Sequence, residues 1–277
     1  MRIDLDRAEM CLRMLLEGNS VRSTERLTGT HRDTILRLLV LIGERAKEFM
    51  ADVVFKQFVE DVEVDEIWGY VGCKEKTRER HDWAEDTCGD FYCFTGMERT
   101  SKLMLAYHLG KRTPEDTSIF LSKLGRATTG RFQVTTDGYG PYASRVPQEF
   151  GHSVDYAMLV KNYSTPEVKE QRRYSPPQIV EAVKTAIWGQ PDESRICTSH
   201  IERSNLSIRM GVRRMTRLTN AFSKKVENHE MALALFFCYY NFCRVHQTLK
   251  TTPAVAAGLA IKTWSVREML ETLATHC

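Results

Sequence analysis

The sequence predicts an α/β protein in which a mixed sheet flanked by helices follows a small helical N-terminal domain. Apolar residues recur at helical spacing through about the first 50 residues. From about Phe58 the pattern changes: apolar and polar side chains alternate over residues 59–72, where Val, Ile, Trp and Tyr are frequent, as in strands. Residues 231–242 are apolar almost all round, which is typical of a buried helix.

The composition is that of an ordinary globular protein. Hydrophobic residues make up 42% of the 277 residues and charged residues 27%, and this length allows one large domain and a small one. No apolar run approaches the roughly 20 residues of a membrane span, and the N-terminus lacks the features of a secretory signal. The eight cysteines are scattered without C-x-x-C pairs. We therefore expect a cytoplasmic protein with reduced thiols and no membrane association.

The net charge of +3 conceals two segments of opposite charge. Residues 60–90 contain eleven acidic and four basic side chains, and residues 195–225 contain eight basic and one acidic. This distribution suits a site that holds both metal cations and a phosphate backbone. It suits equally well a fold in which the two segments pack against each other, and charge alone does not decide between these interpretations.

Three short amphipathic helices are expected at the N-terminus. The first spans residues 6–16, the second starts after Ser20 and ends near Gly29, and the third begins at the capping-box-like pair Thr30 and Asp33. Short helices joined by a tight turn form a helix-turn-helix, although a small bundle without DNA contacts is the alternative. The side chains of the third helix that are expected to face outward, toward a DNA major groove, are His31, Arg32, Thr34 and Arg37.

Three strands of a hairpin meander are predicted next. The first begins at about Phe58 and runs into Asp65, and the others span residues 91–97 and 103–109. This arrangement places Asp65 at the end of a strand.

A helix and two further strands complete the predicted sheet region. Pro114 opens the helix and Gly125 ends it. The strand that follows stops at Asp137 and Gly138, which would leave the Asp137 carboxylate at the sheet edge where α/β folds bind ligands. An Asp-Gly pair more commonly marks only a turn. A last strand is predicted at residues 153–160.

The remaining chain alternates irregular and helical segments. Residues 161–195 contain several Ser-Pro and Gly-Gln-Pro turns and are expected to form an irregular insertion with a few helical turns. A basic helix at residues 201–215 and the buried helix follow. Residues 251–277 are expected to form a helical tail.

The basic helix carries one acid among arginines. Helical spacing predicts an apolar stripe and, beside it, a polar stripe formed by Glu202, Arg209 and Arg213. Taken alone, this pattern indicates a solvated cationic helix in which Glu202 pairs with Arg209 or Arg203. Matching carboxylates on other elements change that interpretation, and Asp65 and Asp137 supply them.

The order strand, strand, strand, helix, strand, helix, with these three acids, resembles the ribonuclease-H-like fold of DDE transposases and retroviral integrases. More specifically, three motifs between about Val64 and His229 resemble the IS1 family of insertion-sequence transposases, and the predicted helix-turn-helix matches that family's DNA-binding segment in placement. The motifs are Asp65-Glu66-Ile67-Trp68-Gly69-Tyr70-Val71-Gly72, Thr136-Asp137-Gly138 with Tyr142, and Ile201-Glu202-Arg203 with Asn205-Leu206, Arg209 and Phe222-Ser223-Lys224.

The resemblance implies that Asp65, Asp137 and Glu202 hold two Mg²⁺ (or Mn²⁺) ions. Two such cations roughly 4 Å apart can activate water or a 3′-hydroxyl and stabilise the leaving oxygen, so that one site can both cut DNA and join its 3′-ends. The arginines expected to neutralise DNA phosphates around this site are Arg203, Arg209, Arg213, Arg214 and Arg217.

Two features depart from the family. Some members carry a zinc-ribbon-like stretch before the helix-turn-helix, which this chain has no cysteine pairs to form, and residues 161–195 are longer than in the shortest members.

Side chains that neighbour the three acids in the sequence are expected to lie outside the site. Glu66 should point to the opposite face of its strand from Asp65, His200 should lie at the surface or in packing, and Trp68 and Tyr70 should pack in the core rather than stack on a base.

The predicted function is that of a DNA transposase. Residues 1–50 would form the helix-turn-helix domain that binds the terminal inverted repeats, and residues 58–250, with an insertion at about 161–195, the catalytic domain. It would cut double-stranded DNA and join the ends to target DNA as a homodimer or higher multimer, in the bacterial cytoplasm and on the nucleoid when DNA-bound. A catalytically silent DNA-binding regulator and a metal-dependent nuclease without strand transfer are the alternatives.

Overall fold

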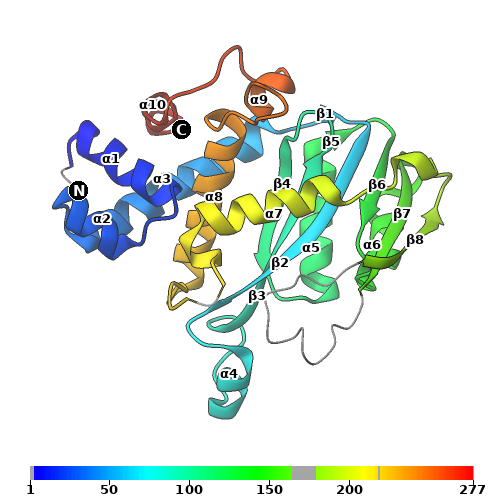
Figure 1. The fold of residues 1–277 in the computed structure, drawn as a ribbon, viewed down its shortest axis with the longest axis horizontal. Helices are drawn as coiled ribbons and strands as arrows, with labels where there is room; N and C mark the ends of the chain where they lie inside the picture. The colour runs from blue at the N-terminus through cyan, green and yellow to red at the C-terminus, as the bar shows by residue number, and fades with distance from the viewer. Residues whose placement is uncertain (1–2, 164–178, 218, 277) are drawn as a thin grey trace.

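A six-stranded mixed sheet lies at the centre of the computed structural model, which describes residues 3–163, 179–217 and 219–276. The strand order is β4-β3-β2-β6-β7-β8 (Figure 1). The central strands β2, β6 and β7 are parallel, and the outer pairings are antiparallel. The predicted mixed α/β class is confirmed. The bounds are β2 (Asp61–Val71), β3 (Gly89–Glu98), β4 (Met104–Gly110), β6 (Phe132–Thr136), β7 (Val154–Tyr163) and β8 (Ile179–Trp188).

Helices cover both faces of the sheet. α5 (Pro114–Ala127) and α6 (Pro141–Phe150) lie on one face, and α7 (Ser199–Gly211) crosses the other (Figure 1). Thr113 caps α5 by accepting a hydrogen bond from the Asp116 N–H at 3.2 Å. Gly125 lies inside α5 and does not end it, because the buried side chains of Leu124 and Ala127 on either side keep this turn packed against the sheet. The smaller elements are β1 (Gln57–Phe58), β5 (Thr128–Thr129), α4 (Glu75–His81), η1 (Gly151–Ser153), η2 (Glu193–Arg195) and η3 (Arg213–Met215).

The three predicted N-terminal helices are present as α1 (Leu5–Leu16), α2 (Val21–Thr28) and α3 (Arg32–Val53). Ser20 caps α2, which ends at Gly29 in the left-handed conformation, with φ of 68°. The predicted cap of α3 was wrong by one residue. Its N-cap is His31, whose Nδ1 accepts from the Asp33 N–H, because the Thr30 side chain is buried within the turn.

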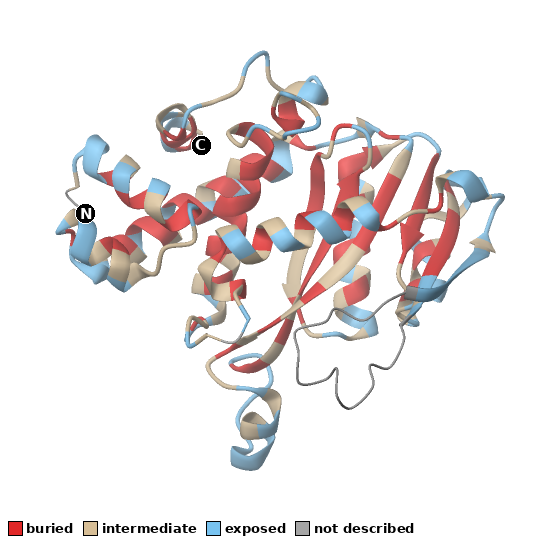
Figure 2. Ribbon diagram, in the orientation of Figure 1, coloured by how far each residue is buried: buried red, intermediate tan, exposed pale blue. Residues whose placement is uncertain are grey.

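A hydrophobic core runs without a break from the N-terminal helices to the sheet. α3 packs against α8 (Val226–Phe242), and Gly43 allows a close approach, since a Cβ at that position would lie 2.6 Å from the Met231 Cβ. α8 is buried along most of its length, as predicted (Figure 2). One cluster of buried residues joins α1, α3, α8, α10 and the central strands. The division of the chain into domains near residue 50 stays a prediction, and core contacts cross that boundary.

The C-terminal residues form two helices that pack onto this core. α9 (Pro253–Ala256) contacts α8, and α10 (Val266–Thr275) contacts α1 and α3. A capping box of Ser265 and Glu268 starts α10.

The predicted helical turns within residues 161–195 were wrong in part. Residues 179–188 form β8, which extends the sheet by pairing antiparallel with β7. β8 is the edge strand and leaves Val180 70% exposed, so its pattern carries little sign of burial. The predicted turns at Ser164-Thr165-Pro166 and Ser175-Pro176-Pro177 lie outside the described residues.

Two general predictions can be compared with the described part of the chain. None of its helices has both the length and the apolar character needed to cross a membrane. The seven cysteines in these residues are free thiols, as expected.

Candidate active site

The fold brings Asp65 and Asp137 together from sequence positions 72 residues apart. β2 and β6 are parallel, and their last paired residues are Val64 and Thr136. Asp65 and Asp137 are the next residue on each strand, at the carboxyl end of the parallel part of the sheet, where α/β folds bind ligands. The predicted end of the first strand was wrong, because β2 continues to Val71 by pairing with β3 alone.

Local hydrogen bonds fix the direction of both carboxylates. Asp137 Oδ1 accepts from the Tyr139 N–H at 3.0 Å, which holds the turn after β6. Asp65 Oδ1 accepts from the Glu66 N–H at 2.8 Å, and its Oδ2 accepts from the Asn205 side chain on α7 at 2.6 Å. Asp65 therefore faces α7.

Glu66 belongs to the same group of acids, so the prediction that it lies outside the site was wrong. One carboxylate oxygen from each of Asp65, Glu66 and Asp137 lies within 4.8 Å of the other two. The Glu66 side chain does leave β2 on the opposite face, where it pairs with Arg112 at 3.3 Å. β6 ends at Thr136, so no strand lies beside Glu66 on that side of β2. The carboxylates of Asp65 and Glu66 can therefore come together at the end of β6, although the two side chains leave β2 on opposite faces.

Burial and neighbouring acids raise the pKa values of these carboxylates. Burial, and then the charge of Asp137, raises the pKa of Asp65 to about 7. The same two causes raise the pKa of Glu66 to about 8, and burial also raises the pKa of Asp137. Carboxylates crowded in this way match the oxygen ligands that a hard divalent cation takes, so these residues fit a divalent-cation site.

Glu202 lines the same cleft, which has a volume of about 450 Å³, together with Asp65, Glu66 and Asp137. It stands apart from the group of acids within 4.8 Å and forms an ion pair with Lys161 of β7. Its Oε1 also accepts from Thr198 Oγ1 at 2.7 Å. The salt bridge expected from the sequence exists, but its partner is Lys161 rather than Arg209 or Arg203. The strand was predicted to end at residue 160, one residue before Lys161, whereas β7 continues to Tyr163.

The predicted arginines divide into separate groups. Arg209 and Arg217 line the cleft, and Arg203 is exposed on α7. Arg209 donates to the Trp68 carbonyl at 3.1 Å and to the Met215 carbonyl at 2.9 Å, and burial lowers its pKa to about 10. Arg209 thus joins β2, α7 and η3.

The basic helix was predicted to continue to Met215, with Arg213 on the same polar stripe as Glu202. Both predictions were wrong. α7 ends at Gly211, and Val212 has an extended backbone. This turn allows both Val212 and Met215 to be buried. Arg213 and Arg214 of η3 line a different cavity, between α1, α3 and α8, and burial lowers the pKa of Arg214 to about 10.

The side chains predicted to read DNA lie on the first turns of α3, at the end of the molecule opposite β7 and β8 (Figure 1). His31, Arg32 and Arg37 are exposed, and Thr34 is half-buried. They are therefore accessible and separate from the acidic cleft.

Arg112, Asn205 and Trp68 line the cleft but were not predicted as site residues. Arg112 pairs with Glu66 and lies 4.3 Å above the Tyr139 ring, and no sequence signal pointed to it. Asn205 belongs to the third motif and could have been assigned to the site, since three residues after Glu202 is the same side of a helix. The prediction that Trp68 and Tyr70 pack in the core was wrong, because both are half-buried and Trp68 lines the cleft. Tyr142, which belongs to the second motif, is fully buried.

Known proteins that are similar to this chain agree with the resemblance found in the sequence. The model of the IS1 transposase family matches residues 190–243, the segment that contains η2, α7 and α8. The insertion element iso-IS1n protein InsB of Shigella dysenteriae is 26% identical over 174 residues, covering 63% of this chain and 91% of the relative. The insertion element IS1 protein InsB of Shigella flexneri is 28% identical over 174 residues, covering 62% and 88%.

Among solved structures, the chain is similar to piggyBac transposase in the cryo-EM structure of its synaptic complex with hairpin DNA, at a TM-score of 0.43 and 10% identity, covering 99% of this chain and 70% of that chain. The family model and the InsB relatives confirm the resemblance found in the sequence: residues 190–243 match the IS1 transposase model, and the chain is similar to InsB proteins of insertion elements.

Proposed function

We propose that the protein is a DDE transposase with a ribonuclease-H-like catalytic domain, in which Asp65, Asp137 and Glu202 hold Mg²⁺ or Mn²⁺. The observation that carries this proposal is the register of β2 and β6. It sets two acids side by side at the carboxyl end of parallel strands, in one cleft with the acid of α7. When bound, two cations would supply an activated oxygen nucleophile and stabilise the leaving oxygen at phosphorus.

The residues of the chain have distinct tasks in this proposal. Asp65 and Asp137 offer carboxylate oxygens from fixed directions, and Glu66 adds a third oxygen within 4.8 Å of them. Glu202 is held by Lys161 and Thr198 and would exchange the lysine for a cation. The exposed Arg217 would bind DNA phosphates at the rim of the cleft.

The N-terminal helices would recognise the ends of the element. In this proposal α2 and α3 form a helix-turn-helix, and the exposed Arg32 and Arg37 on α3 contact base edges of the terminal inverted repeats. Residues 1–50 would then act as the DNA-binding domain and residues 58–250 as the catalytic domain. Two ends must be held together for joining, so a homodimer or higher multimer on double-stranded DNA is part of the proposal.

The decisive experiment is Mg²⁺-dependent cleavage of DNA that carries an element end. Asp65→Asn and Asp137→Asn are expected to reduce cleavage by at least about a thousandfold while leaving DNA binding within severalfold of wild type. Asp86→Asn, which removes an exposed acid beyond α4, is the matched control and should cleave normally. Full cleavage by Asp65→Asn would exclude this active site.

The same reactions separate the two alternatives. A target plasmid is added, and joining of the cut 3′-ends to it is measured. Cleavage without joining would identify a nuclease, and specific binding without cleavage in Mg²⁺ or Mn²⁺ would identify a DNA-binding regulator.

A further inference from the structure

A fourth buried acid, Glu63, lies on β2 two residues before Asp65. Its side chain is 2% exposed, and on β2 it is paired with Met97 of β3 on one side and Thr135 of β6 on the other. Side chains two residues apart on a strand point to the same face of a sheet. Glu63 and Asp65 therefore both face α7.

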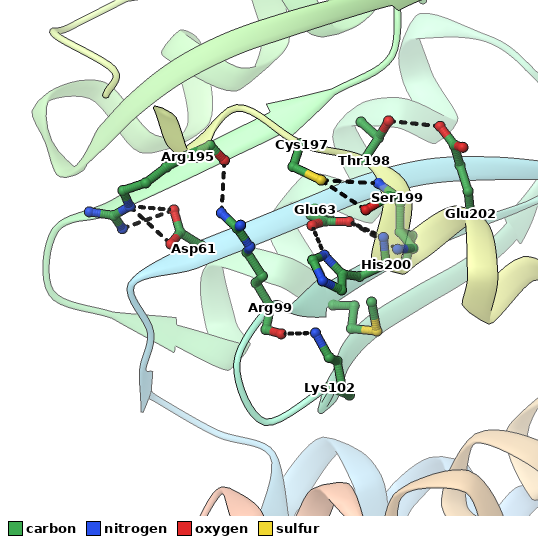
Figure 3. A network of polar contacts seen from close by, with 12 residues as sticks. Asp61, Glu63, Arg99, Lys102, Arg195, Cys197, Thr198, Ser199, His200 and Glu202 are labelled. Carbon is green, nitrogen blue, oxygen red and sulfur yellow. Dashed lines mark hydrogen bonds and ion pairs between the residues drawn. The ribbon is translucent and has the colours of Figure 1, made fainter. Parts of the chain in front are cut away.

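Glu63 accepts hydrogen bonds from the first turn of α7. Its Oε2 accepts from the backbone N–H groups of His200 and Ile201 at 3.0 and 2.9 Å, and its Oε1 lies 2.6 Å from His200 Nδ1 (Figure 3). The first N–H groups of a helix have no partner within it and form its positive end. A buried carboxylate, in turn, needs such donors.

The residue before α7 does not supply this cap. Thr198 is the N-cap by position but makes no side-chain hydrogen bond to the first turn. Its Oγ1 donates to Glu202 Oε1 instead (Figure 3). The helix is therefore capped from β2, the strand that carries Asp65, and its own N-cap residue orients Glu202.

These contacts attach α7 to β2 at two levels. Glu63 binds the backbone at residues 200 and 201, and Asp65 accepts from Asn205 one turn later. Glu202 lies between the two attachments. Because β2 is held on both sides by β3 and β6, the attachments fix both the level of α7 along the strand and its rotation.

We infer that Glu63 is a positioning residue: by capping α7 from β2, it sets the distance between Glu202 and the pair Asp65 and Asp137. This inference rests on the proposed function, in which these acids act in one reaction. A misplacement of about 1 Å in such a site costs on the order of 100-fold in rate. Loss of the cap should therefore lower the cleavage rate and leave DNA affinity unchanged.

Glu63, His200 and Cys197 also bring a carboxylate, an imidazole nitrogen and a thiol within 4.8 Å of one another. Both oxygens of Glu63 are already occupied by α7, and Cys197 Sγ accepts from the Ser199 N–H at 3.4 Å. The cluster is a helix cap and not a metal site. We therefore expect Zn²⁺ alone to shift the thermal midpoint of wild type no more than that of Cys197→Ala. A rise of the midpoint in wild type only would overturn this assignment.

Glu98 provides a matched control. It is a buried acid on the neighbouring strand β3, 7% exposed, and accepts from the backbone N–H groups of Thr100 and Ser101 at 2.7 and 2.5 Å. Its partners lie in the turn after β3, so that Glu98→Gln tests the loss of a buried carboxylate cap away from α7.

The experiment compares Glu63→Gln with Glu98→Gln in single-turnover cleavage at saturating DNA. We expect the Glu63→Gln rate to fall by about 10- to 100-fold, a higher Mg²⁺ concentration at half-maximal rate, and a Kd for end DNA within about twofold of wild type. The Gln variant keeps one acceptor oxygen and should retain more activity than Glu63→Ala. Glu98→Gln should cleave at the wild-type rate. Equal rates for Glu63→Gln and Glu98→Gln would overturn the positioning role.

Hydrogen exchange gives a second measurement that needs no cleavage. The amides of His200 and Ile201 should exchange faster in Glu63→Gln than in Glu98→Gln, and equal protection would contradict the cap. His200→Asn keeps the backbone hydrogen bonds from residues 200 and 201 to Glu63. It should therefore cleave faster than Glu63→Gln. Full cleavage by Asp65→Asn would contradict the proposed function itself. If Asp65→Asn is inactive and Glu63→Gln is fully active, only the positioning role is contradicted.

Discussion

Asn205 of α7 donates a 2.6 Å hydrogen bond to the Asp65 carboxylate on β2, so the helix that carries Glu202 directly holds the first acid of the cleft. This bond occupies Asp65 Oδ2 and leaves Oδ1 with the Glu66 N–H. The direction of Asp65 thus depends on α7 as well as on its own strand.

Replacing Asn205 tests this relationship. In Asn205→Ala the Asp65 side chain loses its fixed direction, and we expect the single-turnover cleavage rate to fall about tenfold and the free energy of unfolding to fall by about 1 kcal/mol. Asn162→Ala, which removes an exposed amide that donates to Glu181, is the control. An unchanged cleavage rate in Asn205→Ala would show that Asp65 does not need this bond.

The acids of the cleft predict how stability depends on pH. In the folded protein the pKa of Asp65 is about 7 and that of Glu66 about 8, whereas the unfolded chain titrates near pH 4. Between these values the folded state binds more protons, so stability falls as pH rises. Each pKa unit of difference corresponds to about 1.4 kcal/mol, so we expect the free energy of unfolding of the metal-free protein to fall by several kcal/mol between about pH 5 and about pH 8.

Thermal unfolding across this pH range, with and without Mg²⁺, measures the effect. Mg²⁺ should raise the midpoint more at about pH 8 than at about pH 5, because it binds the ionised carboxylates. Asp65→Asn should flatten the profile of the metal-free protein. A profile in Asp65→Asn as steep as in wild type would assign the effect to other groups.

Two arginines of the cleft should respond differently to substitution. Arg209 binds two backbone carbonyls with its guanidinium, and a lysine cannot reproduce that geometry. Arg209→Lys should therefore lower the free energy of unfolding by about 1 to 2 kcal/mol. Arg217 is exposed at the cleft, and Arg217→Ala should leave stability unchanged and reduce the salt dependence of DNA binding by about one phosphate contact. Denaturant unfolding and binding at several salt concentrations distinguish the two roles.

Arg37 tests the proposed reading of DNA by α3. Its side chain is exposed one turn after the start of the helix. If it contacts base edges, Arg37→Ala should weaken binding to terminal repeats by about 1 to 3 kcal/mol and binding to random DNA by less. Arg126→Ala, an exposed arginine on α5, is the control for loss of charge. Equal losses on both DNAs would leave α3 without a role in sequence recognition.

Much of the fold could be predicted because it follows local patterns. The helices at the N-terminus and the three strands of the meander have periodicities that permit only one kind of burial, and α8 is apolar almost all round, which is typical of a buried helix. β8 was missed because an exposed edge strand carries no such pattern, and its pairing depends on the free edge of β7. The end of α7 at Gly211 was missed because the burial of Val212 and Met215 against other elements outweighs the helical pattern.

The sequence by itself determined the residue types, the elements that carry them and the resemblance to the IS1 family: Asp65 on a strand, Asp137 after a strand and Glu202 on a basic helix. Tertiary structure alone decided how they meet. Strand pairing sets Asp65 beside Asp137, and the sheet edge at Thr136 brings in Glu66. Lys161 reaches Glu202 from β7, and Glu63 caps α7 from β2. These contacts join residues up to 138 positions apart, and no periodicity within one segment encodes them, because the partner of a buried charge is chosen by the packing of whole elements.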